Sequence, residues 1–293
     1  MPELPEVEAL AQDLRGRLVD RAIARIDLAA FSALKTFDPP LQSLHGTLVE
    51  DVTRHGKFLD ITASGTHLIV HLARAGWIRW RDDVPALPAR PNSKNPLAAR
   101  VVIDDPDFET TPGLDITEAG TKKSLAIYVV RDPQEVPGIA RLGPDPLDDA
   151  FTIDVLAGIL QSEGRKQIKG VLRHQGTIAG IGNAYSDELL HAARMSPYKP
   201  ASSLDEAEVQ TLYDAIRTVI GAAVERSRGL AASELKGEKK SHLAVHGRTG
   251  EACPVCGDTV REVSFADSSL QYCPTCQTGG KPLADRRMSR LLK

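Results

Sequence analysis

Four cysteines near the C-terminus form the clearest chemical pattern in the sequence. They make two Cys-x2-Cys pairs with 16 residues between them: Cys253 and Cys256, then Cys273 and Cys276. Thiols stay reduced in a cytosolic chain, so a disulfide framework is not expected, and a redox pair is the alternative. Two close pairs around a hairpin-length insert can instead surround Zn2+ with four thiolates. Because four ligands close the coordination shell and leave no open position, the predicted Zn2+ is structural rather than catalytic. We expect one such ion and no organic cofactor. With four cysteines available, two nearby histidines are interpreted as loop residues rather than ligands: His242 and His246.

The opening Met1-Pro2-Glu3 could supply a nucleophile. Removal of Met1 would leave a secondary amine on Pro2. An α-amine titrates near about 8, below the value of about 10.4 for lysine, and the positive end of a following helix lowers it further. Such an amine can attack an aldehyde carbon and form an iminium ion, with Glu3 placed to give or take a proton. The alternative is that proline and glutamate simply open a helix, where both are favoured.

Two other segments carry weaker signals. Lys57 follows a turn glycine at the start of a predicted strand, where a solvated lysine is the alternative interpretation. The glycines of residues 180–182 could let a phosphate approach the helix predicted to begin at Asn183. His67 and His71 have a metal-binding spacing for a helix, but they fall in a strand pattern and are interpreted as ordinary sheet positions.

The elements that position these residues change character along the chain. The length of 293 residues predicts about two domains. A helix is expected over residues 3–18, followed by strands over 47–52, 57–62, 66–72, 77–80, 100–103 and 125–130. This succession favours a β-sandwich or barrel. Helices then follow over 152–162, 166–173, 183–194 and 205–228, and a hairpin over 259–265 and 270–272. The fold class is therefore α+β and multidomain.

Predicted boundaries follow the Pro-rich stretches and the cysteines. They are a catalytic β-sandwich domain over residues 1–135, a linker over 136–150, a helical domain over 151–235, a zinc finger over 236–280 and a basic tail over 281–293. We expect the basic tail to add phosphate contacts, so that truncation after Gly280 would flatten the salt dependence of binding.

Composition excludes several classes of protein. The hydrophobic share of 42% and charged share of 26% do not fit a disordered or fibrous chain. No apolar run is long enough for a membrane span and no export signal is apparent, so a cytoplasmic monomer without a membrane partner is expected. The net charge of −3 hides an asymmetry, because residues 226–293 hold 12 basic and 7 acidic side chains. Binding of a charged partner depends on the electrostatic field of the face that it contacts rather than on the net charge of the whole chain, so the negative total does not exclude DNA as a partner.

Taken together and in order, these motifs resemble a bifunctional DNA glycosylase of the formamidopyrimidine-DNA glycosylase / endonuclease VIII family. The resemblance spans nearly the whole chain and rests on Pro2-Glu-Leu-Pro-Glu6-Val-Glu8, Arg54-His-Gly-Lys57, His71-Leu72, Leu142-Gly-Pro-Asp-Pro-Leu147, Ile168-Lys169, Gly180-Ile-Gly-Asn-Ala-Tyr185, Val245-His-Gly-Arg248 and the four cysteines.

The resemblance implies a β-sandwich, a helix–two-turn–helix domain and a zinc finger, with damaged double- or single-stranded DNA bound in the cleft between. It implies base-excision repair and assigns catalytic roles to Pro2 as nucleophile, Glu3 as acid, Lys57 in phosphate contact and proton transfer, and Glu6 in support of the active site. It also implies DNA contacts by Arg74, Lys169, Asn183 and Arg248. The strand would be cut by β-elimination, followed by δ-elimination.

Three departures from the family pattern bear on specificity. Ser268 stands where the finger usually presents an arginine, and Arg261 or the tail arginines are its candidate replacements. Arg74 stands where a methionine usually fills the space left by the extruded base, and residues 116–124 hold no Arg–Phe wedge. A preference for abasic sites, oxidised pyrimidines or single-stranded DNA over 8-oxoguanine paired with cytosine is therefore expected. The alternative function is a non-catalytic module that recognises damaged DNA.

Overall fold

The computed structural model describes residues 1–85, 96–104, 109–265 and 268–284, and these residues form two compact units. The first unit contains residues 1–141 together with 227–236, and the second contains 142–226 and 237 onward. The boundaries expected for the linker, the helical domain and the finger stay predictions.

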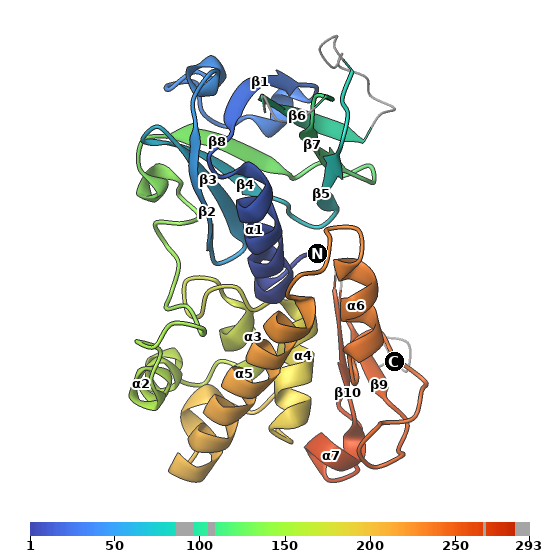
Figure 1. Ribbon diagram of the computed structural model, residues 1–293. Helices are drawn as coiled ribbons and strands as arrows, with labels where there is room; N and C mark the ends of the chain where they lie inside the picture. The colour runs from blue at the N-terminus through green and yellow to red at the C-terminus, as the bar shows by residue number, and fades with distance from the viewer. Residues whose placement is uncertain (86–95, 105–108, 266–267, 285–293) are drawn as a thin grey trace. The chain divides into compact units, whose positions relative to one another are not determined.

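The first unit is a sandwich of two antiparallel four-stranded sheets, preceded by helix α1 (Leu4–Leu18) (Figure 1). One sheet has the order β1 (Ala22–Leu28), β6 (Leu97–Asp104), β7 (Gly113–Glu118) and β5 (Gly76–Arg81). The other has the order β2 (Val49–His55), β3 (Phe58–Ala63), β4 (Thr66–His71) and β8 (Ala126–Val130). Short 3-10 turns lie at Phe31–Ala33, Leu41–Leu44 and Pro133–Glu135. The predicted sandwich is confirmed.

A single hydrophobic core joins both sheets and α1. Alternate residues of each strand point inward, such as Leu59 and Ile61 of β3 and Ile103 of β6, because successive side chains of a strand face opposite sides. The helix contributes Val7, Leu10, Leu14 and Leu18 to this core, from the apolar face that its spacing predicts, and Leu4 of the same face is buried as well. This packing fixes the N-terminal end of α1, and with it Pro2 and Glu3, against the sandwich.

The loop that follows the long helix α5 (Glu206–Ser227) returns to the first unit. Ala232 and Leu235 are buried in the core of the sandwich. The carbonyl of Ala232 accepts a hydrogen bond from the indole nitrogen of Trp77 at 2.8 Å. The first unit is therefore built from two stretches of chain that lie far apart in sequence.

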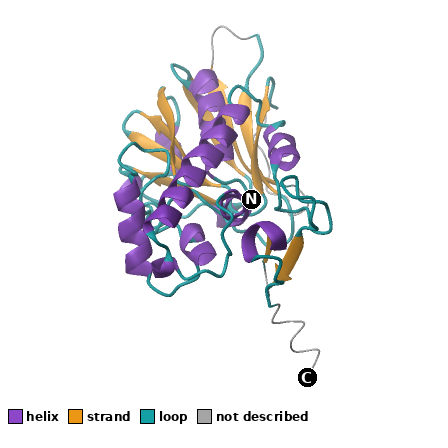
Figure 2. Cartoon of the chain, turned by 90° about the horizontal axis from the view of Figure 1, so that it is seen from below, coloured by secondary structure: helices purple, strands orange, loops and turns teal. Residues whose placement is uncertain are grey.

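The second unit consists of helices and loops except for two short finger strands (Figure 2). Its helices are α2 (Ile153–Glu163), α3 (Ile168–Arg173), α4 (Asn183–Ala192), most of α5 and α6 (Leu235–His242), with a 3-10 turn at Ala201–Ser203. The finger holds β9 (Arg261–Ser264), β10 (Ser269–Tyr272) and α7 (Pro274–Thr278). In the described part of the chain, no helix is both long and apolar enough to cross a membrane.

Candidate active site and metal centre

The N-terminal end of α1 holds three of the residues singled out by the sequence. Pro2 is buried, and the side chains of Glu3 and Glu6 are each only 2% exposed. The two glutamates form a reciprocal capping box: Glu6 accepts a hydrogen bond from the Glu3 backbone N–H at 2.8 Å, and Glu3 accepts one from the Glu6 backbone. This arrangement satisfies two amides at the helix start and fixes the backbone that carries Pro2.

Lys57 lies in a two-residue turn between β2 and β3 and is only 6% exposed, so it is not the solvated edge lysine that its sequence also allowed. Gly56 precedes it with a φ of 55°, a conformation that glycine adopts without strain. Arg54 supports the turn: its guanidinium donates to Glu8 of α1 at 2.9 Å and to the carbonyl of Gly56 at 3.1 Å. The sequence reasoning had given Arg54 and Glu8 no role.

His71 ends β4 beside this turn. Its ring packs against Phe58, with 4.5 Å between the ring centroids. Burial, and then the positive charge of Lys57, lower the pKa of His71 to about 4. The imidazole is therefore neutral at physiological pH and can both donate and accept a hydrogen bond. Both histidines of β4 occupy sheet positions as predicted, and His67 contacts the buried Asp60 at 3.0 Å.

Arg74 is exposed in the short loop between β4 and β5. Its neighbour Ala73 has a φ of 51°, which costs a non-glycine residue about 1 kcal/mol. Gly76 closes the loop by donating from its N–H to the Leu72 carbonyl at 2.8 Å. A Cβ at Gly76 would lie 2.1 Å from that carbonyl oxygen, so only glycine fits there.

Lys169, expected to contact phosphate, is buried at 5% exposure in the second unit. Its ammonium donates to Asp187 at 2.6 Å, to the Ser186 hydroxyl at 2.7 Å and to the Asn183 carbonyl at 3.1 Å. Because an ammonium has three N–H donors, these acceptors use all of them. A phosphate contact by Lys169 stays a prediction. It would require one of these three hydrogen bonds to be replaced by a hydrogen bond to the phosphate.

Asn183 begins α4 as predicted, after Gly182. Its amide nitrogen donates to the carbonyl of Ser269 in β10 at 2.8 Å. Its amide oxygen is the one buried side-chain polar atom without a partner among the residues that the structure describes. Arg248 donates to Glu251 at 2.7 Å and to the Leu243 carbonyl. Phosphate contacts by these two residues stay predictions.

Two adjacent carboxylates of α4 tie the finger to the helices. Glu188 accepts hydrogen bonds from three consecutive backbone amides, residues 244 to 246, at 2.6 to 3.0 Å. Burial raises the pKa of Glu188, and these amides oppose that rise. Asp187 accepts from His246 at 2.7 Å and from the Gln271 backbone at 3.2 Å, besides its ion pair with Lys169. No pattern in the sequence predicts this network.

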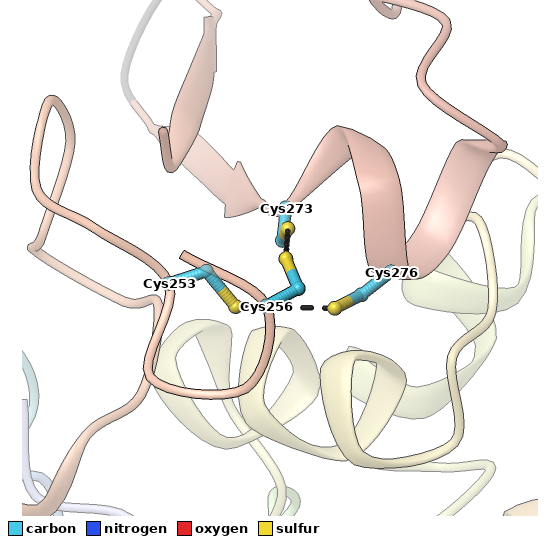
Figure 3. A group of neighbouring side chains, drawn as sticks. All are labelled: Cys253, Cys256, Cys273 and Cys276. Atoms are coloured by element: carbon cyan, nitrogen blue, oxygen red, sulfur yellow. Dashed lines mark hydrogen bonds between the residues drawn. The ribbon is translucent and has the colours of Figure 1, made fainter. Parts of the chain in front are cut away.

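The four thiols converge on one point, with their sulfurs all within 4.8 Å of one another (Figure 3). Cys253 and Cys256 come from a loop, and Cys273 and Cys276 from the start of α7. The sulfurs of Cys253 and Cys276 are 3.9 Å apart, and those of Cys256 and Cys273 are 3.4 Å apart. Tetrahedral Zn–S bonds of about 2.3 Å place sulfurs roughly 3.8 Å apart, so the thiols fit zinc.

The surroundings of the thiols also suit a cation. Burial raises the pKa of Cys273 to about 11 and raises that of Cys276 as well, so these thiols ionise at neutral pH only if a cation offsets their charge. His191 is not one of the four clustered residues, but its Nε2 lies 3.2 Å from the sulfur of Cys253, within hydrogen-bond distance of that thiol. His242 and His246 are not in the cluster. His246 lies in a loop, as predicted, whereas His242 is the last residue of α6, so the prediction of a loop was wrong there.

The finger turn carries Ser268, whose carbonyl accepts from the Phe265 amide at 2.7 Å. Arg261, a candidate replacement for the missing arginine, is exposed at the start of β9. The tail arginines and the end of the predicted tail lie outside the described residues.

Comparison with known proteins agrees with this geometry. Three family models match: the formamidopyrimidine-DNA glycosylase N-terminal domain over residues 1–118, its H2TH domain over 142–234, and the zinc finger found in FPG and IleRS over 250–279. Together they cover most of the chain. The formamidopyrimidine-DNA glycosylase of Symbiobacterium thermophilum is 35% identical over 299 residues, which cover 98% of this chain and 93% of that protein.

Shorter relatives and solved structures agree. An uncharacterized formamidopyrimidine-DNA glycosylase-like protein of Mycobacterium tuberculosis is 61% identical over 152 residues, 52% of this chain and 94% of that one. The MutM (Fpg) structure from Thermus thermophilus superposes with a TM-score of 0.78 at 31% identity, covering 96% of this chain and all of that one. A Lactococcus lactis Fpg bound to DNA with an AP site gives 0.79 at 26% identity, covering 94% and 99%. The chain belongs to the formamidopyrimidine-DNA glycosylase / endonuclease VIII family.

Proposed function

We propose that the protein is a base-excision repair enzyme, a DNA glycosylase with abasic-site lyase activity. The observation that carries this proposal is the burial of Glu3, Glu6 and Lys57 in the first unit. Ionisable side chains are almost never buried for packing alone, and such groups gather at catalytic sites. Family membership and the DNA-bound relatives add support. We further propose that it acts as a cytoplasmic monomer on damaged DNA.

The chemistry begins after removal of Met1, which converts the Pro2 nitrogen from an amide into a secondary amine. That amine attacks C1′ of the damaged nucleotide while the base leaves with its electron pair, and Glu3 protonates the sugar as the base departs. The attacking nitrogen gives up its proton, and its electron pair then forms the C1′=N bond while the C1′–O4′ bond breaks and O4′ keeps the proton from Glu3. The resulting iminium ion acidifies the proton on C2′. Loss of that proton expels the 3′ phosphate, which is β-elimination, with Lys57 in contact with phosphate and serving proton transfer. δ-Elimination would follow, and water then releases Pro2.

The target nucleotide must leave the helix stack, since C1′ cannot be reached inside a duplex. Arg74, Asn183 and Arg248 are proposed to contact the DNA, and Lys169 to contact phosphate or to position the start of α4 that does so. Glu6 is proposed as a positioning residue, since its contact with the Glu3 amide fixes the nucleophile's backbone.

The proposed lesion preference rests on two loops of the first unit. By the family resemblance, these loops would lie beside the space that an extruded base leaves in the DNA. Arg74 is exposed on a short loop, and residues 119–124 fold back on Glu118, whose carboxylate accepts from the amides of Ser124 and Leu125. We propose a preference for abasic sites, oxidised pyrimidines or single-stranded DNA. Matched steady-state assays on defined duplex and single-stranded substrates test it, and a strong preference for 8-oxoguanine opposite cytosine contradicts it.

Borohydride trapping tests the activity itself. The mature protein, with loss of Met1 verified by intact mass, should become covalently linked to abasic DNA. A chain with an N-terminal extension should give no adduct because its Pro2 nitrogen is an amide, whereas Pro2→Gly keeps an amine and can retain part of the lyase activity. A mature protein that binds abasic DNA without forming an adduct would be the non-catalytic module instead.

A further inference from the structure

A cavity lies in the first unit, away from the N-terminus of α1. Its volume is about 450 Å³, within the usual size of small-molecule pockets. It is lined by the second half of α1, by β5, by the loop of residues 231–233 and by the start of α6. The residues that the argument uses are Arg17, Trp77, Arg79, Trp80, Arg81 and Lys236. Arg17 follows Glu3 by 14 residues, which places it roughly 20 Å along the helix from the proposed catalytic end.

The cavity carries positive charge that the protein itself does not neutralise. Arg17 is paired with Asp13 at 2.9 Å. Arg81 lies 3.1 Å from Asp115, but that carboxylate already binds Arg100 through both of its oxygens. In the described part of the chain, neither Arg79 nor Lys236 has a carboxylate partner. The lining therefore holds at least two cations in excess.

The two indoles are fixed by their own hydrogen bonds. Trp77 donates to the Ala232 carbonyl at 2.8 Å, and Trp80 donates to Asp82 at 3.0 Å. The ammonium of Lys236 sits 4.4 Å from the ring centre of Trp77, and the guanidinium of Arg17 sits 5.0 Å from that of Trp80. Trp77 is almost fully buried, at 6% exposure, and Trp80 is half-buried, so it is mainly Trp80 that presents rigid apolar surface next to the cations.

An anion in this cavity would relieve an unfavourable arrangement. Burial, and then the charge of Arg79, lower the pKa of Lys236, so these surroundings disfavour the charged form of its ammonium. A phosphate between Arg79 and Lys236 would offset both charges through charge-assisted hydrogen bonds. A planar ring attached to that phosphate would find the indole surfaces beside it.

We propose that this cavity binds a nucleoside phosphate, with the phosphate held by Arg79 and Lys236 and the base packed against the tryptophans. The ligand has two possible sources with the same chemistry: a free mononucleotide, or the phosphorylated end of a DNA strand. The site would be separate from the one that removes the base.

Intrinsic fluorescence reports on this cavity directly, because the chain has 2 tryptophans and both line it. The full-length protein is titrated with thymidine monophosphate, with thymidine, with inorganic phosphate and with a 5′-phosphorylated single-stranded oligonucleotide, and calorimetry repeats each titration. Saturable fluorescence changes are expected with the nucleotide, at concentrations about tenfold below those needed for phosphate or for thymidine.

Arg79→Gln and Lys236→Gln should each weaken nucleotide binding about tenfold, since each removes a charge-assisted contact. Arg131→Gln is the matched control, because Arg131 is an exposed arginine of the first unit that pairs with Asp38 outside the cavity. Binding of the oligonucleotide but not of the mononucleotide identifies a strand end as the source, and binding of the mononucleotide identifies the free ligand; either supports the proposal.

The proposal is overturned if neither phosphorylated ligand produces a saturable change, if inorganic phosphate binds as well as the nucleotide, or if both glutamine variants bind like the control. These titrations use no abasic DNA and do not require the Pro2 amine. A failure of borohydride trapping therefore leaves this test intact, and a failure of nucleotide binding leaves the proposed repair activity intact.

Discussion

The backbone N–H of Glu3 donates to the carboxylate of Glu6 at 2.8 Å, and both side chains are buried at the start of α1. Each of these two buried carboxylates accepts a hydrogen bond from the backbone N–H of the other residue. The contact makes the position of the proposed nucleophile depend on a residue four positions away.

Replacing Glu6 should therefore affect both stability and adduct formation. Glu6→Ala loses one side of the capping box and should cost about 1 kcal/mol of unfolding free energy. Glu6→Gln keeps an oxygen acceptor and should cost less. Thermal unfolding and borohydride trapping are measured on the same preparations. Trapping that is slower in the alanine variant and largely kept in the glutamine variant supports positioning; equal loss in both would point to the charge itself.

Acid should destabilise the first unit through His71. Its pKa is lowered to about 4 in the folded protein, whereas an unfolded histidine titrates near about 6.5. Between these values the unfolded state binds more protons, so unfolding free energy rises with pH from about 4 to 6.5, by at most about 1.4 kcal/mol per unit.

Urea titrations at several pH values compare the parent with His71→Gln, which should show a smaller slope over that range. His242→Gln, an exposed histidine at the end of α6, is the control and should keep the parent slope. Identical slopes in the parent and in His71→Gln would contradict the assignment.

Breaking the buried pair of Lys169 and Asp187 should be costly. Asp187→Asn leaves the ammonium without its charge partner in a site that excludes water, and should cost about 3 kcal/mol. Adding Lys169→Met should recover part of the loss, because the unpaired charge is then gone. Lys166→Ala removes an exposed pair with Glu163 and should cost less than about 1 kcal/mol. Urea unfolding followed by circular dichroism measures all three, and a double variant no more stable than Asp187→Asn would argue against a charge effect.

Zinc should be present at one ion per chain and should depend on all four thiols. Cys256→Ser removes an exposed ligand and should abolish stoichiometric zinc, measured with a chromogenic chelator after denaturation. Val255→Ser, at the exposed neighbouring position, should keep the metal. Zinc retained in the cysteine variant would require a different ligand set.

Local patterns could be predicted from the sequence and long-range contacts could not. The clustering of the four cysteines could be predicted because they come in two short spacings, and α1 could be predicted because its apolar residues recur every three or four positions. That these thiols bind zinc stays a prediction. The strand β1 was missed because Arg25 and Asp27 interrupt its alternation, although Asp27 is buried and pairs with that arginine at 3.1 Å. The helix α6 was missed because it has little apolar periodicity.

The burial of Lys57 shows the same limit. The local sequence is equally compatible with a turn in which Lys57 is exposed to solvent. The observed turn is supported by the hydrogen bond from Arg54 to Glu8, a residue 46 positions earlier in the chain. Likewise, the ion pair that occupies Lys169 involves a carboxylate on another helix. The motifs indicated that Lys57 and Lys169 are candidate functional residues. The residues that surround each lysine could be identified only from the fold.

The return of residues 227–236 to the sandwich limits how the protein can be divided. A fragment ending at residue 141 would lack Ala232 and Leu235, so the Trp77 indole would lose its acceptor and the core would be left with a gap on that side. The first unit can therefore not be released intact by a single proteolytic cut, and no continuous segment of the chain contains the whole of it without most of the second unit.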